Sequence, residues 1–145
     1  MDVHDAALDE LDPGTLYRIL ALRGAVFVVE QDCAYLDPDG RDAEPGARLL
    51  WVERDGEVVA TLRLLADANG AVRIGRVATA ASVRGDGLAG RLMTRALELA
   101  GPRTVVLDAQ SYLVDWYARF GFVPSGAEFL EDGIPHVPMQ RPAAG

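Results

Sequence analysis

Apolar residues along this chain follow two spacings, and the change from one to the other separates helices from strands. In residues 16–27 they recur every three or four positions, which predicts a helix of about 12 residues. Asp12 and Pro13 mark its start, because a capping aspartate followed by proline is typical of a helix N-terminus. The same spacing predicts two further helices, over residues 88–100 and 112–120, each followed by glycine.

Shorter segments show the alternation or the β-branched runs that are typical of strands. Asp55-Gly56 predicts a tight hairpin turn, Asn69-Gly70 marks a second turn, and Gly75 is interpreted as a bulge within a strand. The predicted strands are residues 48–53, 57–64, 72–79, 104–109, 122–129 and 136–141. The other segments are expected to be an irregular or weakly strand-like start, a loop and a closing turn, in residues 1–11, 32–42 and 131–135 respectively.

The predicted elements follow the order helix, antiparallel strands, helix, strand, helix and strands. This order is typical of an α/β or α+β fold in which helices cover the faces of one mixed sheet. With 145 residues, half of them hydrophobic, the chain is long enough for one domain with a substantial core and short for two. We therefore expect a single domain over residues 1–145.

The charge balance narrows the classes of partner. The chain carries 22 acidic and 14 basic residues, a net charge of −8, which argues against nucleic acid or an anionic membrane. No signal peptide is recognisable at the start, and no apolar run approaches the roughly 18–20 residues that span a bilayer. Cys33, the single cysteine, cannot form an internal disulfide. These features predict a cytoplasmic protein.

The segment with the clearest chemistry, Val83 to Gly90, is rich in glycine and lies between a predicted strand and a predicted helix. The first turn of a helix leaves backbone N–H groups unpaired at the positive end of the helix dipole, so this loop is suited to an anion and above all to phosphate. It lacks the lysine and hydroxyl residue of a P-loop, and its spacing differs from the dinucleotide-binding fingerprint. By itself, the pattern is also compatible with a plain strand-to-helix turn.

Arg84-x-x-Gly87-x-Ala89 in this segment resembles the loop that binds the pyrophosphate of acetyl-CoA in the GNAT-type N-acetyltransferases. Val77-Ala78-Thr79 resembles the strand that contacts the pantetheine arm in that family, and Tyr117 to Phe122 resembles its Tyr-x-x-x-Gly-Phe segment. Residues 26–35 and 129–136 are similar to the ElaA-type subgroup. Together these segments cover most of the chain from about residue 15 to 141.

The resemblance implies a mixed, mostly antiparallel central sheet, flanked by helices, whose central strands splay apart. It also implies acetyl-CoA as co-substrate, held by the loop, by Arg84 and by the preceding strand, whose N–H groups would polarise the thioester carbonyl. Gln110 stands where many family members carry an asparagine, and its amide can form similar hydrogen bonds. The expected donor-binding residues are Val77, Ala78, Thr79, Arg84, Gly85, Asp86, Gly87, Leu88, Ala89, Gly90 and Gln110.

Tyr117 is the expected general acid, because a phenol stays protonated at neutral pH and can protonate the departing thiolate. Outside the Gly-Phe context it would be interpreted as a core aromatic. The general base is left open, with a chain of water molecules as one alternative. Glu30 and His136 are retained as candidate bases or substrate contacts, since Glu30 follows the first helix and histidine suits proton transfer near neutral pH. The other candidates are Asp37, Asp39, Asp108 and Glu131.

The remaining reactive residues point to no metal and no covalent intermediate. Two histidines, of which His4 lies in a loose start, and one cysteine lack the spacing of a zinc site. No histidine or basic cluster lies near Cys33 to activate its thiol. Asp37, Asp39 and Asp42 lack the glutamate of a calcium loop, so they are expected to be a solvated loop or a lip for a cationic acceptor.

The function expected from these features is acetyl-CoA-dependent N-acetyl transfer, directly to a primary amine of a small molecule or peptide, by a monomer or homodimer. One alternative is a non-catalytic acyl-CoA-binding sensor. The other is an acyltransferase with a longer acyl donor, since Arg23-x-x-Val26-Phe27 faintly resembles a motif of acyl-homoserine-lactone synthases. The sequence does not identify the acceptor. Loops such as residues 30–47 and 124–136 select it, and the sequences of such loops follow no rule that carries over between proteins.

Overall fold

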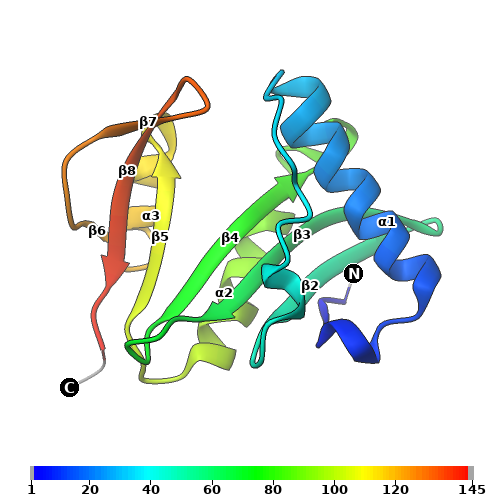
Figure 1. Ribbon diagram of the computed structural model, residues 1–145, viewed down its shortest axis with the longest axis horizontal. Coiled ribbons are helices and arrows are strands. Elements are labelled where there is room, and N and C mark those ends of the chain that lie inside the picture. The colour runs from blue at the N-terminus through cyan, green and yellow to red at the C-terminus, as the bar shows by residue number, and fades with distance from the viewer. Residues whose placement is uncertain (1, 144–145) are drawn as a thin grey trace.

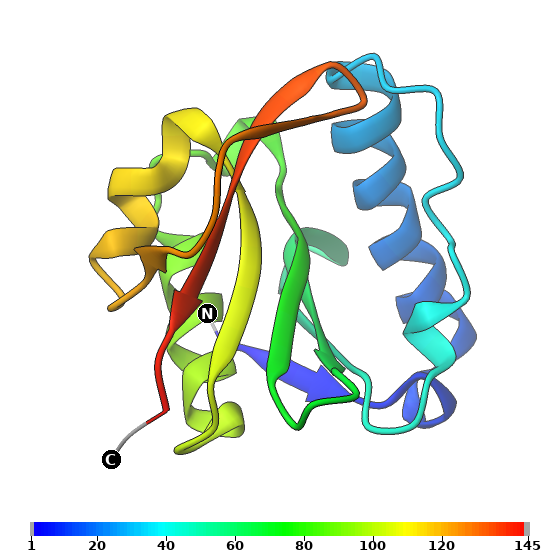
Figure 2. The same ribbon diagram turned by 60° about the vertical axis from the view of Figure 1, so that its left-hand side comes forward.

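The computed structural model describes residues 2–143 and consists of one eight-stranded sheet with helices on both faces (Figures 1 and 2). The strands are β1 (His4–Ala6), β2 (Arg48–Arg54), β3 (Glu57–Ala66), β4 (Val72–Thr79), β5 (Val105–Gln110), β6 (Val123–Pro124), β7 (Phe129–Glu131) and β8 (Ile134–Arg141). The α-helices are α1 (Pro13–Arg23), α2 (Leu88–Ala100) and α3 (Val114–Ala118). The other helical turns are η1 (Leu8–Glu10), η2 (Gly24–Glu30), η3 (Arg41–Ala43), η4 (Ala81–Val83) and η5 (Ser111–Leu113).

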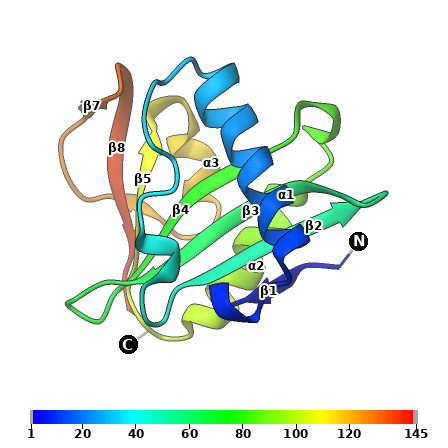
Figure 3. The same cartoon turned by 45° about the vertical axis from the view of Figure 1, so that its right-hand side comes forward.

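The strand order across the sheet is β1-β2-β3-β4-β5-β8-β6, with β7 paired to β8. Every pair is antiparallel except β4 and β5, which run parallel. Helix α1 crosses one face of the sheet, whereas α2 and α3 lie on the other (Figures 2 and 3). The prediction of a mixed, mostly antiparallel sheet flanked by helices is therefore confirmed.

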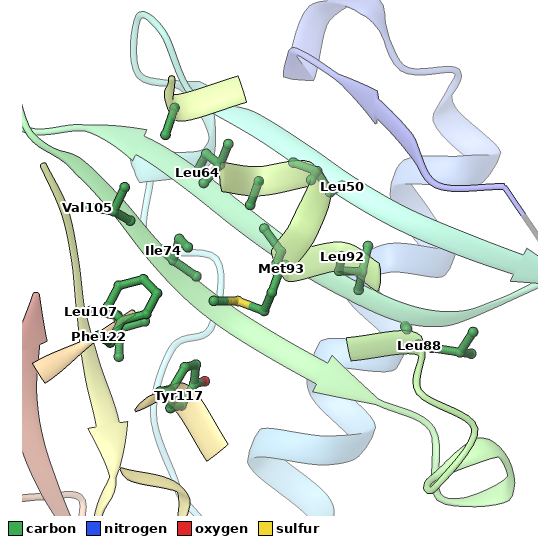
Figure 4. Packing of buried hydrophobic residues seen from close by; sticks show 14 of the residues in the cluster. Leu50, Leu64, Ile74, Leu88, Leu92, Met93, Val105, Leu107, Tyr117 and Phe122 are labelled. Carbon is green, nitrogen blue, oxygen red and sulfur yellow. The ribbon is translucent and has the colours of Figure 1, made fainter. Parts of the chain in front are cut away.

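Strand alternation gives the sheet a separate apolar cluster on each face. In β2, Leu50 and Val52 pack with α2, whereas Leu49 and Trp51 pack with α1. The larger cluster lies between the sheet, α2 and α3, and Figure 4 shows Met93 of α2 directed at the sheet within it. These two clusters pack the sheet between helices on both faces. The sheet and these helices, which we call the frame, hold the site rigidly.

The central strands β4 and β5 separate soon after they meet. Their ladder consists of Val72 with Val105 and Arg73 with Val106. Beyond this point β4 runs on to Thr79 with no ladder partner on its β5 side among residues 2–143, and Figure 1 shows the two strands diverging upward. The predicted splay of the central strands is confirmed, and it leaves main-chain groups of both strands facing a gap.

The bulge in β4 lies at Arg76 and not at Gly75, where the sequence pattern was interpreted to place it. Arg63 of β3 pairs with Gly75, and Thr61 pairs with Ala78, so β4 carries one residue more than β3 between these pairs. The extra residue keeps Gly75 and Ala78 on the same face. Arg76 has a φ of +54°, in the left-handed region, whereas Gly75 does not. This conformation costs energy, which the ion pairs of Arg76 described below offset.

Several predicted boundaries shift. Of the two alternatives for the start of the chain, the strand-like one holds at β1, which pairs with β2. Helix α1 continues as η2, a π-helical segment, and the predicted helix over residues 112–120 divides into η5 and α3. The predicted strand over residues 122–129 is reduced to β6 and the first residue of β7. Asp132 and Gly133 both adopt positive φ, the conformation of a two-residue hairpin, so the closing turn is shorter than expected.

Over residues 2–143, every helix falls short of the length and apolar character that a membrane-crossing segment needs.

Candidate active site

A cleft of about 610 Å³ occupies the gap between β4 and β5. Both strands line it, together with η2, the segment that follows η2, the β7–β8 hairpin and the aromatic residues of η5 and α3. Among the residues expected to bind donor or to act in catalysis, those that line it are Glu30, Val77, Ala78, Thr79, Arg84, Ala89, Gln110, Tyr117 and His136. The fold therefore gathers most of the candidate residues at one place.

The glycine-rich loop brings the N-terminus of α2 to this cleft. Gly85 and Gly87 have φ of +91° and +78°, a conformation that glycine adopts without strain. Gly87 caps α2 with no side-chain hydrogen bond, so the first-turn N–H groups have no cap from the protein. An anion with several oxygen acceptors fits this arrangement.

The side chains of two loop residues are engaged within the protein. Leu88 is buried in the apolar cluster between the sheet, α2 and α3 (Figure 4). Asp86 forms an ion pair with Arg54 at 3.4 Å. Among the expected donor-binding residues, Gly85, Asp86, Gly87, Leu88 and Gly90 do not line the cleft.

Arg84 reaches across the cleft mouth to Glu30. Two hydrogen bonds of 2.6 Å join its guanidinium to the two carboxylate oxygens, and its Nε donates to the carbonyl oxygen of Thr79 at 3.2 Å. Both side chains remain exposed, at 44% for Arg84 and 46% for Glu30. The hydrogen bonds from Arg84 lower the pKa of Glu30, which makes this carboxylate a weaker proton acceptor. Glu30 in this state is a partner of Arg84 and not a free base.

Gln110 at the end of β5 also bridges the cleft. Its Nε2 donates to Oε1 of Gln31, directly after η2, at 3.3 Å. Sequence reasoning did not single out Gln31, although it lies within the ElaA-like segment of residues 26–35. This pair places two amides opposite each other on the wall, where both can bond an extended polar ligand.

Tyr117 lies at the cleft with its ring in the core. Its side chain is 6% exposed, and its ring packs edge-on against Trp116 and Phe122 (Figure 4). Burial raises the pKa of the Tyr117 hydroxyl to about 12. No hydrogen bond within residues 2–143 uses this hydroxyl. The tyrosine is therefore both a core aromatic and a protonated donor at the cleft, so the two interpretations of it do not exclude each other.

The aspartates of the acidic loop after Cys33 bind arginines, although much of the loop backbone is exposed. The arginines project from α1, β3 and β4 and form with the aspartates one group, buried at Arg23, Arg63, Asp37 and Asp42, which we call the Arg–Asp cluster. The cluster consists of Arg23, Arg63, Arg76, Asp37, Asp39 and Asp42. The expectation of a solvated loop, or of a carboxylate lip for a cationic acceptor, is wrong for these three side chains because arginines already occupy them.

Arg23 is at the centre of the Arg–Asp cluster. Its Nε donates to Asp37 at 2.8 Å, and its two terminal nitrogens donate to Asp42 at 2.7 and 3.1 Å. Arg63 binds Asp39 through two hydrogen bonds of 2.9 and 3.1 Å. Arg76 completes the group from the β4 bulge, with Nε 2.9 Å from Asp37. The cluster ties the loop between η2 and β2 to three elements of the frame.

These contacts remove several candidates for the general base. Burial acts to raise the pKa of Asp39, but the hydrogen bonds from Arg63 prevail and lower it to about 2. Asp37 is bound by Arg23 and Arg76, and Asp108 lies 3.5 Å from Arg73. Arginines therefore lie against these three carboxylates, whereas two other candidates have no such partner within residues 2–143.

His136 and Glu131 are those candidates. His136 is half-buried on β8, where its Nδ1 lies 2.7 Å from the carbonyl oxygen of Ile134 and its ring stacks on Phe129. Glu131 is exposed on β7 and forms no ion pair within residues 2–143. Both line the cleft.

The remaining reactive residues lie apart from any metal-like arrangement. Cys33 is buried, with Sγ 3.9 Å from the carbonyl oxygen of Asp132, and His4 stacks on Trp51 instead of lying in a loose start. Across residues 2–143, no group of three or more His, Cys, Asp or Glu side chains is placed to hold a metal ion.

The arrangement has an anion-binding helix terminus, a gap between strands with free main-chain groups, and a protonated phenol, all on one cleft. The acetyltransferase (GNAT) domain family matches residues 29–142 of this chain. The chain belongs to this family of acyltransferases.

Within the family, the chain falls in the group of Protein ElaA. It is 40% identical to ElaA of Escherichia coli over an alignment of 146 positions, which covers 97% of this chain and 94% of that protein. It is 49% identical to the UPF0039 protein Rv2851c of Mycobacterium tuberculosis over 140 residues, 94% of this chain and 90% of that one.

Solved structures agree with these relatives. The crystal structure of an acyl-CoA N-acyltransferase from Pseudomonas aeruginosa superposes with a TM-score of 0.92 at 41% identity, over 97% of this chain and 99% of that one. The crystal structure of Escherichia coli ElaA has a TM-score of 0.91 at 38% identity, over 97% and 98% of the two chains.

Proposed function

We propose that this protein is an acetyl-CoA-dependent N-acetyltransferase that transfers the acetyl group directly to a primary amine. The observation that carries the proposal is the single cleft that joins the uncapped N-terminus of α2, the free edges of β4 and β5, and the hydroxyl of Tyr117. Each part matches one need of the reaction: an anchor for the donor, a groove for its arm and a proton for its thiolate.

The loop and strand residues supply the donor site. The N–H groups of residues 84–90 bond the pyrophosphate, and Arg84 turns from Glu30 to add a charged contact. The pantetheine arm lies in the gap beside Val77, Ala78 and Thr79, with Gln110 as a side-chain partner, and a β4 N–H group polarises the thioester carbonyl. The N–H groups of Arg84 and Asp86 donate to the carbonyl oxygens of Ala81 and Val83. The first-turn N–H groups of α2 have no cap from the protein, and Arg84 has an exposed and exchangeable partner, which supports these roles.

Tyr117 completes the transfer. A neutral amine attacks the thioester carbon, the carbon–sulfur bond breaks, and the Tyr117 hydroxyl gives its proton to sulfur. The raised pKa keeps this hydroxyl protonated until the thiolate forms. The buried ring of Tyr117 fixes the position of its hydroxyl group, so little reorganisation is needed when negative charge develops on the sulfur.

The experiment is a thiol-release assay with acetyl-CoA and a panel of amines, which are alkylamines, polyamines, aminoglycosides, amino acids and peptides. The proposal expects calorimetric binding of acetyl-CoA and amine-dependent thiol release with at least one acceptor. Binding with no release for any amine would favour a non-catalytic acyl-CoA sensor. The same assay with hexanoyl- and octanoyl-CoA tests the longer donor, which is favoured if its kcat/KM exceeds that of acetyl-CoA.

Replacement of the proposed acid is the sharpest test of mechanism. Tyr117→Phe is expected to lower kcat by roughly 10²–10⁴-fold and to leave the Kd for acetyl-CoA unchanged, because the ring still packs and only the proton is lost. Tyr112→Phe is the matched control, since Tyr112 lines the same cleft but is exposed. Equal turnover of the two variants would refute the role of Tyr117.

A further inference from the structure

The proposed reaction needs a group that takes a proton from the acceptor, and the contacts of the cleft leave few groups free to do so. Glu30, Asp39 and Asp108 are each held by an arginine. Glu131 is exposed to solvent, and an ordinary carboxylate has little affinity for a proton at neutral pH. His136 is the remaining candidate, and imidazole is the side chain best suited to exchange protons there.

The hydrogen bond of His136 fixes which ring nitrogen is free. A carbonyl oxygen can only accept, so the 2.7 Å contact between Nδ1 and the Ile134 oxygen requires a proton on Nδ1. In the neutral ring Nε2 then carries a lone pair and no proton. Stacking on Phe129, with ring centroids 5.7 Å apart and planes inclined by 23°, holds the ring in this orientation. The imidazole is therefore in the tautomer that a base requires.

Strand alternation places His136 on the face of the sheet opposite Tyr117. Val137 and Met139, the residues that alternate with it on β8, pack in the same apolar cluster as Tyr117. His136 pairs with Gln110 across β5 and β8, so their side chains share the other face, where Gln110 meets Gln31. Both His136 and Tyr117 line the cleft. The gap between β4 and β5 is thus flanked by a proton donor on one face and a proton acceptor on the other.

We infer that His136 is the general base of this enzyme, with Nε2 as the accepting atom; this inference rests on the proposed N-acetyl transfer. The acceptor enters from the face of α1 and gives one proton of its ammonium group to Nε2. Its nitrogen then bonds the acetyl carbon while sulfur leaves and takes the Tyr117 proton. Of the two protons that nitrogen loses between ammonium and amide, His136 passes one to solvent and the other restores Tyr117.

The groups around His136 permit this role. The hairpin contributes carboxylates that attract an ammonium ion, and the other neighbours are neutral or already paired. The charged and titratable groups that line the cleft with His136 are Glu131 and Asp132 of the hairpin, Asp108 of β5 with Arg73, Glu30 of η2 with Arg84, Cys33, Tyr35, Tyr112, Tyr117, and Asp39 with Arg63 and Arg76.

Two substitutions separate catalysis from structure. His136→Asn keeps a donor for the Ile134 oxygen, and His136→Phe keeps the stack on Phe129, so at least one is expected to fold as the parent does. Both are expected to lower kcat at least roughly 100-fold, to leave the Kd for acetyl-CoA unchanged and to abolish the acidic limb of the kcat/KM profile. His4→Asn, which removes the histidine stacked on Trp51 outside the cleft, is the matched control.

A comparison of two acceptors separates a catalytic role of His136 from a structural one, because a structural role would lower kcat equally with both. With an acyl hydrazide acceptor, whose terminal nitrogen is unprotonated at neutral pH, the loss of kcat is expected to be far smaller than with the best alkylamine. Added imidazole is expected to restore part of the alkylamine rate. Equal losses with both acceptors and no rescue, or parental kcat and pH profile in either folded variant, would overturn the role of His136 while N-acetyl transfer stands. Absence of thiol release by the parent enzyme would overturn both.

Discussion

Arginine binds carboxylate in two regions of this molecule, with similar geometry and opposite consequences. In the Arg–Asp cluster the side chain of Arg23 is 1% exposed and contacts two buried aspartates. At the cleft mouth, Arg84 and Glu30 form a pair of equally short hydrogen bonds, yet each is almost half exposed. Bond length does not distinguish the two regions, whereas access to water does.

Burial decides which of these contacts can be exchanged. Within the cluster, no water molecule replaces a lost partner, so breaking one bond leaves a bare charge in a poorly polarisable interior. At the cleft mouth, solvent compensates each charge, and a phosphate group can take the place of the Glu30 carboxylate at little cost. The first region is therefore a fixed support for the loop after η2, and the second is a contact that the donor can displace.

The largest effect is expected from removal of Arg23. Arg23→Met should lower the free energy of unfolding by about 3–5 kcal/mol, because it removes the shortest ion pairs of the buried Asp37 and Asp42 and leaves each with one arginine, Arg76 and Arg63 respectively. Urea unfolding followed by circular dichroism measures it. Arg84→Met is the matched comparison, and it should leave the unfolding midpoint unchanged. A small effect of Arg23→Met would show that the cluster, like the cleft pair, is accessible to water.

Acid should weaken the cluster through Asp39. The pKa of Asp39 is about 2 in the folded chain against an ordinary 3.8. A depressed folded-state pKa gives stability that is present above the unfolded value and is lost as pH falls through the folded value, here from about 4 to 2. Because the Asp39 side chain is 29% exposed, solvent screens this contribution, and the loss is on the order of 1 kcal/mol. Asp39→Asn should flatten this part of the stability profile, and an unchanged slope would contradict the shift.

The exchangeable pair should show its effect in donor binding instead of stability. Arg84→Met is expected to raise the Kd for acetyl-CoA roughly tenfold, the loss of one charge-assisted contact to phosphate, with kcat at saturation retained. Arg91→Met, an exposed arginine on α2 outside the cleft, is the control for charge. Equal weakening by both variants would assign the effect to the net charge of the protein.

The smallest effect, and the one of opposite sign, is expected from Glu30. Glu30→Gln frees Arg84 from its intramolecular partner, so the Kd for acetyl-CoA should fall by roughly two- to fivefold. Calorimetry at low ionic strength gives the best resolution, because salt screens an exposed pair. Glu57→Gln, an exposed glutamate at the start of β3, is the control. Weaker binding in Glu30→Gln would show that Glu30 orients Arg84 for the donor instead of competing with it.

Much of the frame was predictable because its signals are local. The strand predicted over residues 72–79 and the helix over residues 88–100 coincide with β4 and α2. The Asp55-Gly56 hairpin also forms as expected, with both residues at positive φ. In each case a glycine or an alternation within a few positions determines the backbone, and packing on the frame agrees with it. The cleft was predictable because the family resemblance implies that the central strands splay apart.

The Arg–Asp cluster was not predictable in the same way, because its partners lie 14 to 39 residues apart in the chain. An acidic loop has the same composition whether water or arginine surrounds it. A signal was nevertheless present: Arg23 falls on the apolar stripe of α1, and Arg63 lies in the middle of an apolar strand. A charged residue at a core position requires a partner of opposite charge, and three aspartates in the next loop supply it.

A sheet normally has an edge at each border, but the divergence of β4 from β5 adds two edges inside this molecule. An internal edge recognises an extended ligand through N–H and C=O groups, which are the same for nearly every amino acid. Substitution of side chains on these strands then has little effect on the binding of an extended ligand. If the donor binds along this internal edge and side chains select the acceptor, as proposed above, a change of acceptor does not require the donor site to be rebuilt.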